Sequence, residues 1–466
     1  MLMEILFYVV IFFFGTILSQ WIFSSKAQLP PSPSGLPIIG HLHLLNKTPH
    51  QSFHKLCTRY GPLIYLRLGS VLCIVASSPQ LVKELLVTNG LAFSSRPINI
   101  AVQLTSYDGR GFSFAPYGPY WKFMKKFVVM ELLGERNLAR MQYIRIDEIS
   151  QLLLLLLNKA SSHETVNLSA EVSKVANNII SRMMLSIKLS GEDEQAKEMR
   201  KLAQEMTGIV IHFNSSDFIG CLRNFDLHGI KKMAKSIHSR YDSLLEKIMK
   251  ERAENKTENK DFLDMLLDIS EDTNAKIRLS RENIKAFMID FLTAATDTSG
   301  ASFEWAMSEL INNPTILEGA KEEIDSVVGK KRLVKESDIP NLPYLQIAGY
   351  DIPAKTILFI NNWAISRDPN YWENPLKFEP KRGQHFNLLP FGTGRRACPG
   401  LSLATQVVPT VLALLIQCFD WKIPCNDGAS SSNLVDMTER PGLTVGKAQP
   451  LVLVPSARLV SFPVAT

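Results

Sequence analysis

The longest helical pattern of apolar positions in this chain begins after Ser280. Apolar residues recur three and four positions apart, as they do along one face of a helix, at Ile284, Phe287, Met288, Phe291, Leu292 and Ala295. Ser280 is of a residue type favoured at a helix N-cap. The pattern predicts a helix that continues to Asn312, about 32 residues and about 48 Å long. Such a helix would cross a whole domain.

A second apolar pattern occupies the N-terminus. Residues 5–25 carry no charge and are rich in Phe, Ile, Leu and Val. A helix of that length spans about 31 Å, one hydrocarbon core, so we expect residues 1–26 to form a transmembrane anchor. A cleaved signal peptide is the alternative, but the run is long, no basic residue precedes it and no clear small-residue cleavage site follows. Glu4 before the run and Lys26 after it favour a cytoplasmic location for the rest of the chain.

The remaining patterns predict one further domain behind a hinge. Residues 27–40 contain four prolines, which favour a stiff extended connector. Residues 41–466 contain no Gly/Ser linker, low-complexity tract or internal repeat that would divide them. Within them, residues 61–76 predict a hairpin at Gly69, residues 79–89 a short helix, and residues 98–119 an irregular loop. A basic helix follows from Tyr120, and residues 145–275 show helical patterns, so the fold class is mainly α with small β-sheets.

Composition and charge exclude several classes of protein. The net charge of +6 is mild for 466 residues, and no dense Lys/Arg run is interleaved with aromatic residues, so nothing points to nucleic acid. The six cysteines contain no C-x-x-C pair, which argues against a zinc site and against a disulfide framework. A reducing, cytosol-facing location fits this usage best.

The candidate chemistry lies in residues 391–400, Phe-Gly-Thr-Gly-Arg-Arg-Ala-Cys-Pro-Gly. Cys398 follows two arginines and precedes a long apolar run, and both nearby positive charge and a helix N-terminus favour an ionised thiolate. Glycines in the loop would let a large flat group approach the backbone. A lone cysteine is often only a small buried apolar residue, but the whole ten-residue pattern favours a ligand.

These residues resemble the haem-ligand loop of the cytochrome P450 family. The pattern Phe-x-x-Gly-x-Arg-x-Cys-x-Gly is met by Phe391, Gly394, Arg396, Cys398 and Gly400. The resemblance implies a cytochrome P450 fold and a haem b whose iron takes Cys398 as its axial ligand, with the other four residues placing the cofactor. In such a site the thiolate pushes electron density that favours O–O cleavage.

Two further segments match this family. Ala294, Ala295, Asp297 and Thr298 lie within the long predicted helix and resemble the oxygen-activation motif, in which an acid beside an alcohol delivers protons. A threonine bonded only to its own helix is the alternative, and Ala295 stands where the family usually has Gly. On the basic helix, the resemblance gives Trp121 and Lys125 contact with a haem propionate; a solvated basic face is the alternative there.

One part of the family pattern is missing. Between residues 341–346 and 347–355 the family normally has a helix with Glu-x-x-Arg and a strand that lines the substrate pocket, but here the two flanks join directly. The single Glu-x-x-Arg match, residues 379–382, contains a proline and belongs to a neighbouring motif. Arg382 would lose its usual partner, and a buried unpaired charge costs about 3–5 kcal/mol. The fold is therefore expected to be incomplete.

The flanking segments resemble plant microsomal members of the family that act on flavonoids and isoflavonoids. The implied reaction inserts one oxygen atom into a C–H bond of a small apolar phenolic substrate, and the electrons come from NADPH through a separate NADPH–cytochrome reductase. The implied location is the endoplasmic reticulum membrane, with the catalytic domain facing the cytosol. The alternative is a membrane-anchored remnant that does not retain haem.

Overall fold

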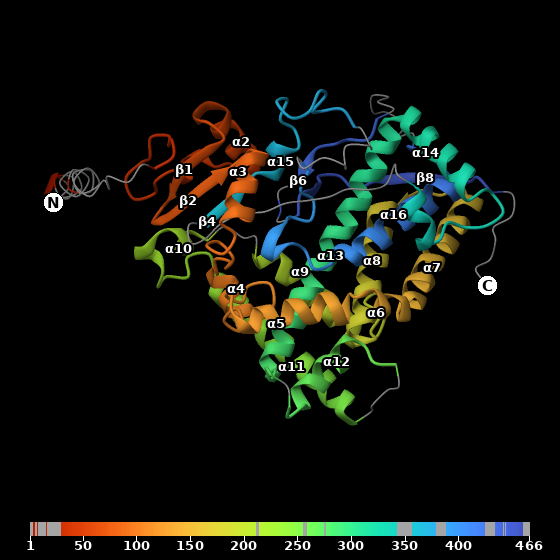
Figure 1. The fold of residues 1–466 in the computed structure, drawn as a ribbon, viewed down its shortest axis with the longest axis horizontal. Coiled ribbons are helices and arrows are strands. Elements are labelled where there is room, and N and C mark those ends of the chain that lie inside the picture. Colours follow the sequence, from red (N-terminus) through yellow and green to blue (C-terminus); the bar gives the residue numbers. More distant parts are fainter. Residues whose placement is uncertain are drawn as a thin grey trace.

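A computed structural model provides the structure of the chain (Figure 1). It describes residues 3, 4, 7, 15, 29–210, 214–254, 259–274, 276–342, 357–378, 388–424, 434–440, 442 and 444–459. The predicted anchor, residues 1–26, lies outside this set apart from four positions. The junction between Gln346 and Ile347 and residue Arg382 lie outside it as well.

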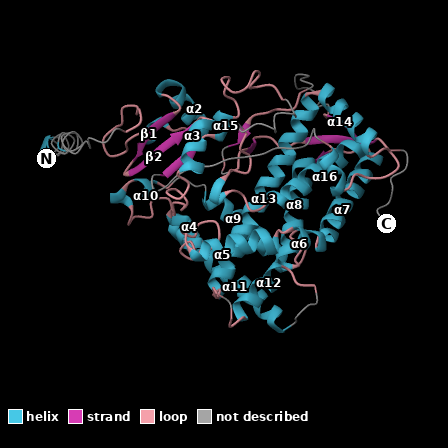
Figure 2. Cartoon of the chain, viewed as in Figure 1, coloured by secondary structure: helices cyan, strands magenta, loops and turns pink. Residues whose placement is uncertain are grey.

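Helices make up most of the described chain, and short strands form small sheets (Figure 2). The first helical elements are η1 Leu42–Leu44, α2 Pro49–Tyr60, α3 Pro79–Lys83, η2 Glu84–Thr88, α4 Ile100–Thr105, α5 Pro119–Phe127, η3 Val128–Leu132, α6 Glu135–Arg140, α7 Gln142–Ser161 and α8 Leu168–Leu185. The later ones are α9 Glu194–Val210, α10 Ser215–Phe218, η4 Gly220–Leu222, α11 Ile230–Glu254, α12 Phe262–Glu271, α13 Arg281–Asn312, α14 Pro314–Val327, η5 Glu336–Asn341, α15 Asn362–Ile365, η8 Gly394–Arg396 and α16 Leu401–Cys418. The mainly α prediction is confirmed.

The strands form three sheets in the described residues. The strands are β1 Leu63–Leu68, β2 Val71–Ala76, β3 Val166–Asn167, β4 Ile357–Ile360, β5 Phe419–Lys422, β6 Glu439–Arg440, β7 Gly446–Lys447 and β8 Val452–Ala457. The sheet orders are β1-β2-β4, β3-β8-β5 and β6-β7. β1 and β2 are antiparallel, and β4 joins β2 in parallel. The strand that follows the predicted junction therefore lies in the N-terminal sheet.

The predicted hairpin at Gly69 is confirmed. Along β1, Ile64, Leu66 and Leu68 alternate toward a small core shared with α2, as the period of a strand requires. Gly69 has φ +61°, and a Cβ there would lie 2.2 Å from the carbonyl oxygen of Phe218. Glycine is needed at this turn for both reasons.

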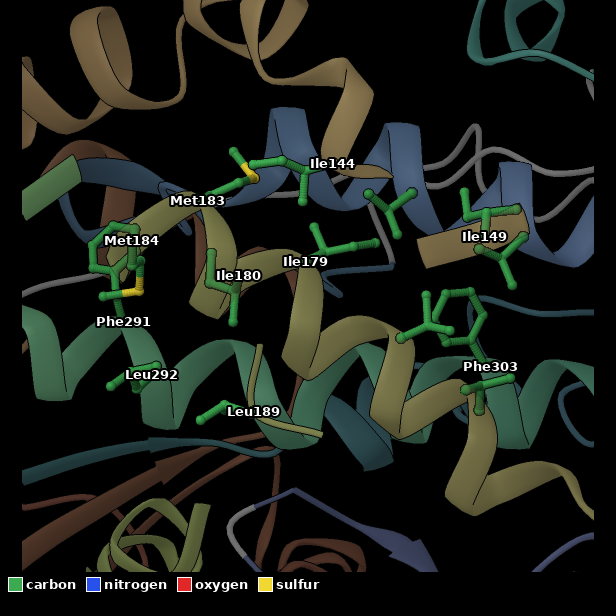
Figure 3. Packing of buried hydrophobic residues seen from close by; sticks show 14 of the residues in the cluster. Ile144, Ile149, Ile179, Ile180, Met183, Met184, Leu189, Phe291, Leu292 and Phe303 are labelled. Carbon is green, nitrogen blue, oxygen red and sulfur yellow. The ribbon is translucent and has the colours of Figure 1, made fainter. Parts of the chain in front are cut away.

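The long central helix is also confirmed. α13 covers the predicted Arg281–Asn312, and Ser280 and Asn283 form a reciprocal capping box at its start. α13 runs through the helical part beside α8 and α16 (Figure 1). Side chains from α8, including Ile179, Ile180 and Met183, share one buried cluster with Phe291 and Phe303 of α13 (Figure 3).

α16 follows the cysteine loop directly. Of the helices that the structure describes, it alone is long and apolar enough to cross a membrane, but its residues from Val407 onward are almost all buried in the main core. α16 is therefore a core helix, and its buried C-terminal part anchors the segment that follows Cys398.

The prediction of an irregular loop over residues 98–119 is wrong in part, because α4 lies within it. The Asn99 side chain caps α4 by accepting a hydrogen bond from the Val102 amide at 2.8 Å. The Asp217 carboxylate, from α10, accepts a second bond from the Ile100 amide at 2.9 Å. One of the two caps comes from a distant segment, so local sequence did not reveal the helix.

Candidate haem-thiolate site

The cysteine loop is a compact turn that presents Cys398 at its surface. The Cys398 amide donates to the Phe391 carbonyl oxygen at 3.0 Å, which closes the loop. Gly392 and Gly394 adopt φ +57° and +73°, a region that favours glycine. Cys398 has a free, exposed thiol. A Cβ at Gly400 would lie 3.6 Å from its Sγ, so this glycine also keeps the space beside the sulfur open.

Three cations surround Cys398: Arg96, Lys125 and Arg396. We call these four residues the Cys398 cluster. Lys125 donates to the Ala397 carbonyl oxygen at 2.6 Å and so ties α5 to the loop. Burial lowers the pKa of Lys125; the sulfur of Cys398 opposes this shift, whereas Arg396 and Arg96 add to it. Desolvation by the surrounding protein lowers the pKa of Arg96 as well, against the effects of Asp290 and Cys398, although the residue as a whole is exposed. Among the ion pairs of the described residues none involves these three cations, but the charge of Asp290 acts on Arg96.

Arg396 has more hydrogen-bond donors than protein acceptors. It donates to the carbonyl oxygens of Ser94 and Ala115, and its guanidinium lies 4.3 Å from the centre of the Trp121 ring. Its Nη1 is buried and has no hydrogen-bond partner among the described residues. Burial lowers the pKa of Arg396 to about 10, and the charge of Arg96 adds to this effect. A buried unpaired donor is costly unless a ligand supplies the acceptor.

Trp121 is buried and its one donor is used within the protein. Nε1 donates to the Phe112 carbonyl oxygen at 3.2 Å, and the two rings stack with centres 5.9 Å apart. Trp121 therefore lies next to the cations and orders Arg396, while its own contact with a propionate stays a prediction.

The oxygen-activation residues lie midway along α13. Ala294 and Thr298 are exposed and Ala295 is half-buried. The Thr298 hydroxyl donates to the Ala294 carbonyl oxygen at 2.9 Å, as the alternative interpretation expected, yet its lone pairs remain available as acceptors. The backbone of Asp297 is helical, and its side chain lies outside what the structure describes. Ala295 and Leu403, which follows the cysteine loop, border the same core.

Sequence reasoning missed two residues, Arg96 and Asp290. Asp290 is buried on α13 and accepts a hydrogen bond from the Ser113 amide at 2.8 Å. Burial raises the pKa of Asp290 to about 7, although the Ser113 amide and Arg96 favour the ionised form. An acid inside the apolar stretch 286–292 was a usable signal. Arg96, in a short loop before α4, carried no signal of its own.

The donor set fits a haem with two propionates. One accessible thiol supplies an axial ligand for iron. Lys125 and Arg396, which form no ion pair among the described residues, and Arg96, which also faces Asp290, complement two carboxylates. No group of three or more His, Cys, Asp or Glu residues that could hold a bare metal ion is found in the part searched, which covers the described residues.

Comparisons with known proteins agree with this chemistry. The sequence model of the cytochrome P450 family matches residues 30–348 and 345–444. The two matched segments meet at the predicted junction between Gln346 and Ile347. "Cytochrome P450 93A3" of Glycine max is 49% identical over 499 residues, with 97% of each chain covered. That span exceeds the 466 residues of this chain, so the relative contains segments without a counterpart here.

Three other similar proteins extend the comparison. The "3,9-dihydroxypterocarpan 6A-monooxygenase" of Glycine max is 47% identical, with 95% of this chain and 96% of that protein covered. A zebra fish cytochrome P450 structure with progesterone has a TM-score of 0.75 and 24% identity, covering 89% of this chain and all of the other, which supports the fold. A third similar protein, the "2-hydroxyisoflavanone synthase" of Glycyrrhiza echinata, is 37% identical, with 93% of this chain and 92% of that protein covered. The chain is therefore a member of the cytochrome P450 family of haem-thiolate monooxygenases.

Proposed function

We propose that this chain inserts one oxygen atom from O₂ into a C–H bond of a flavonoid or isoflavonoid substrate. The observation that carries the proposal is the Cys398 cluster, where an exposed thiol lies near Lys125 and Arg396, which donate to backbone carbonyl oxygens and form no ion pair among the described residues. A bound haem would supply oxygen activation at iron. The protein's part is to hold the haem, to orient the substrate and to move protons.

The site residues divide this work. Cys398 would ligate the iron, and Lys125 and Arg396 would pair with the propionates. The Trp121 ring, which packs against the Arg396 guanidinium, would hold that side chain in place. Phe391, Gly394 and Gly400 would keep the loop closed around the sulfur and leave room for the ring. Ala294 and Ala295 are small enough to let the flat group lie against α13. Asp297 would take up protons and Thr298 would pass them inward, since its oxygen retains acceptor capacity.

The electrons would come from NADPH through a separate reductase. Lys122 and Lys126 on α5 are exposed beside Lys125, so this helix presents positive charge near the cysteine loop. Such charge steers an acidic partner toward the site. The anchor over residues 1–26, the hinge over 27–40 and the domain over 41–466 would place both proteins on the endoplasmic reticulum membrane, with this domain facing the cytosol.

The substrate class follows from the relatives. One relative, 47% identical, is a 3,9-dihydroxypterocarpan 6A-monooxygenase by name. A polycyclic phenolic is small and apolar enough for a haem-side pocket.

The test is product formation in a reconstituted system. The full chain, a plant NADPH–cytochrome reductase and NADPH are incubated with a panel of flavanones, isoflavones and pterocarpans, and products are analysed by mass spectrometry. The expected result is a product heavier by one oxygen atom, labelled when ¹⁸O₂ is used and absent without NADPH. Turnover only of unrelated substrates, such as fatty acids, would contradict the substrate class.

A second function is favoured by a specific observation. The family match breaks at residues 345–348, where the family has its Glu-x-x-Arg helix. A chain that lacks this helix would be a membrane-anchored remnant without haem. Haem content of the purified protein decides between the two functions.

A further inference from the structure

We infer that Asp290 is a positioning residue of the haem site. It holds residues 111–115 against α13 and, through that segment, sets the position of Arg396 in the Cys398 loop. The inference rests on the proposed function, because it assigns Asp290 a part in placing a group that the Cys398 cluster would bind.

The contact between Asp290 and the segment is direct. The Ser113 amide donates to Oδ2 of Asp290 at 2.8 Å. Gly111 lies so close that a Cβ added there would come 2.2 Å from the same Oδ2 and 2.9 Å from the Ala286 carbonyl oxygen. The loop backbone therefore rests on α13 with no room for a side chain between them. Asp290 contacts residues 111–115 directly, while Asn283 and Glu282 of α13 hold the adjoining Arg110.

The other side of residues 111–115 is bound to Trp121 and Arg396. Trp121 donates to the Phe112 carbonyl oxygen at 3.2 Å and stacks on the Phe112 ring. Arg396 donates to the Ala115 carbonyl oxygen and lies over the Trp121 ring at 4.3 Å. The segment 111–115 thus links a carboxyl group of α13, bound at Ser113, to the guanidinium of Arg396, bound at Ala115. A shift of this segment would move the acceptor of Arg396.

Asp290 changes charge near neutral pH. Arg96 faces it from the loop before α4, Tyr120 from α5 and Tyr241 from α11, and the amides of Phe112 and Ser113 donate to it. Burial outweighs the effects of Arg96 and the amides and brings the pKa of Asp290 to about 7. Because this pKa lies above the unfolded value, the native state binds more protons between about pH 4 and pH 7. The contribution of Asp290 to stability is greatest below that window and falls as pH rises to 7.

A local test needs no haem. The assay follows trypsin cleavage after the exposed Arg110, at the edge of the held segment, in the purified full-length protein. Asp290→Ala removes the acceptor and is expected to raise this cleavage rate about tenfold, whereas Asp290→Asn keeps an acceptor oxygen and stays near wild type. Asp261→Ala is the matched control, because Asp261 is buried and paired with Arg252 far from this loop. Equal cleavage of wild type and Asp290→Ala, or an equal rise in Asp261→Ala, would overturn the inference.

A second test uses the holoenzyme. The fraction of thiolate-ligated haem is read from the reduced carbon-monoxide spectrum between pH 5.5 and 8.5. The wild type is expected to change across a midpoint near 7, and Asp290→Asn is expected to lose that step. A step that persists in Asp290→Asn contradicts the role of this carboxyl group. If the wild type binds no haem, the proposed function fails, and the cleavage assay still decides whether Asp290 holds the loop.

Discussion

Two arginine-centred regions of this molecule use positive charge in opposite ways. Arg145, 1% exposed, has Nε and Nη2 bound to the Glu336 carboxylate at 2.5 and 2.8 Å and Nη1 bound to the Leu138 carbonyl oxygen at 3.0 Å. Gln406 of α16 accepts from it at 3.3 Å. Arg396 has two carbonyl acceptors, an aromatic ring and one buried nitrogen for which the described part of the chain offers no partner. The first arginine is satisfied by the fold, and the second has capacity left for a ligand.

The difference separates stability from function. The Arg145 contacts join α7, η5 and α16, so they fix the helix that follows Cys398. The Cys398 cluster concentrates positive charge, and Lys125 and Arg396 form no ion pair among the described residues. Changes in the first region are therefore expected to act on the free energy of unfolding, and changes in the second on haem retention.

The largest expected effect comes from breaking the buried pair. Glu336→Ala leaves the Arg145 guanidinium buried without its carboxylate, and is expected to lower the free energy of unfolding by about 3–5 kcal/mol. Denaturant unfolding measures this. Glu164→Ala, which breaks an exposed pair with Lys159 at the end of the same helix, serves as control and should leave the unfolding midpoint unchanged. An equal loss in both variants would show that Arg145 has no special role.

Proton delivery should respond without a change in stability. Asp297→Asn keeps the size of the side chain but removes the acid, and is expected to lower turnover by about 100-fold. Turnover is measured in the reconstituted system together with the unfolding midpoint. Unaltered turnover would assign proton delivery to another group.

Haem retention should fall when Arg396 loses its charge. Arg396→Met is expected to weaken haem binding about tenfold, because it removes the charged donor that has no protein partner. Haem affinity is measured by titration of the haem-free protein. Arg395→Met is the matched control, because Arg395 is exposed and donates to the Tyr117 hydroxyl. Equal loss in the control would indicate that general positive charge, rather than Arg396, holds the cofactor.

The smallest effect is expected at the exposed lysines of α5. The double variant Lys122→Glu and Lys126→Glu should slow electron transfer from the reductase a few-fold at low salt, and the difference should shrink at about 0.5 M salt because exposed charges are screened. Stopped-flow haem reduction measures the rate. A salt-independent defect would mean that the lysines act on the fold instead.

Sequence patterns predicted the elements whose signals are local. The cap at Ser280 and the apolar spacing after it gave α13 its bounds, and Gly69 gave the hairpin. The ten-residue loop around Cys398 identified the chemistry because its glycines and arginines lie within one turn.

The features that the sequence did not reveal depend on contacts between distant segments. α4 is capped partly by Asp217, more than a hundred residues away in the chain. Asp290 gains its role only where the loop at Ser113 meets α13, and Arg96 gains its role only beside Cys398. Spacing along one element does not contain this information. The same applies to the unpaired nitrogen of Arg396, which becomes visible only when its neighbours are in place.

The central claim is that this chain holds haem through Cys398 despite the missing Glu-x-x-Arg helix. The most direct measurement is the reduced carbon-monoxide difference spectrum of the purified full-length protein and of Cys398→Ala. The account predicts the Soret band of a thiolate-ligated haem in the wild type and its loss in the variant. A folded wild-type protein that shows no such band would contradict the claim.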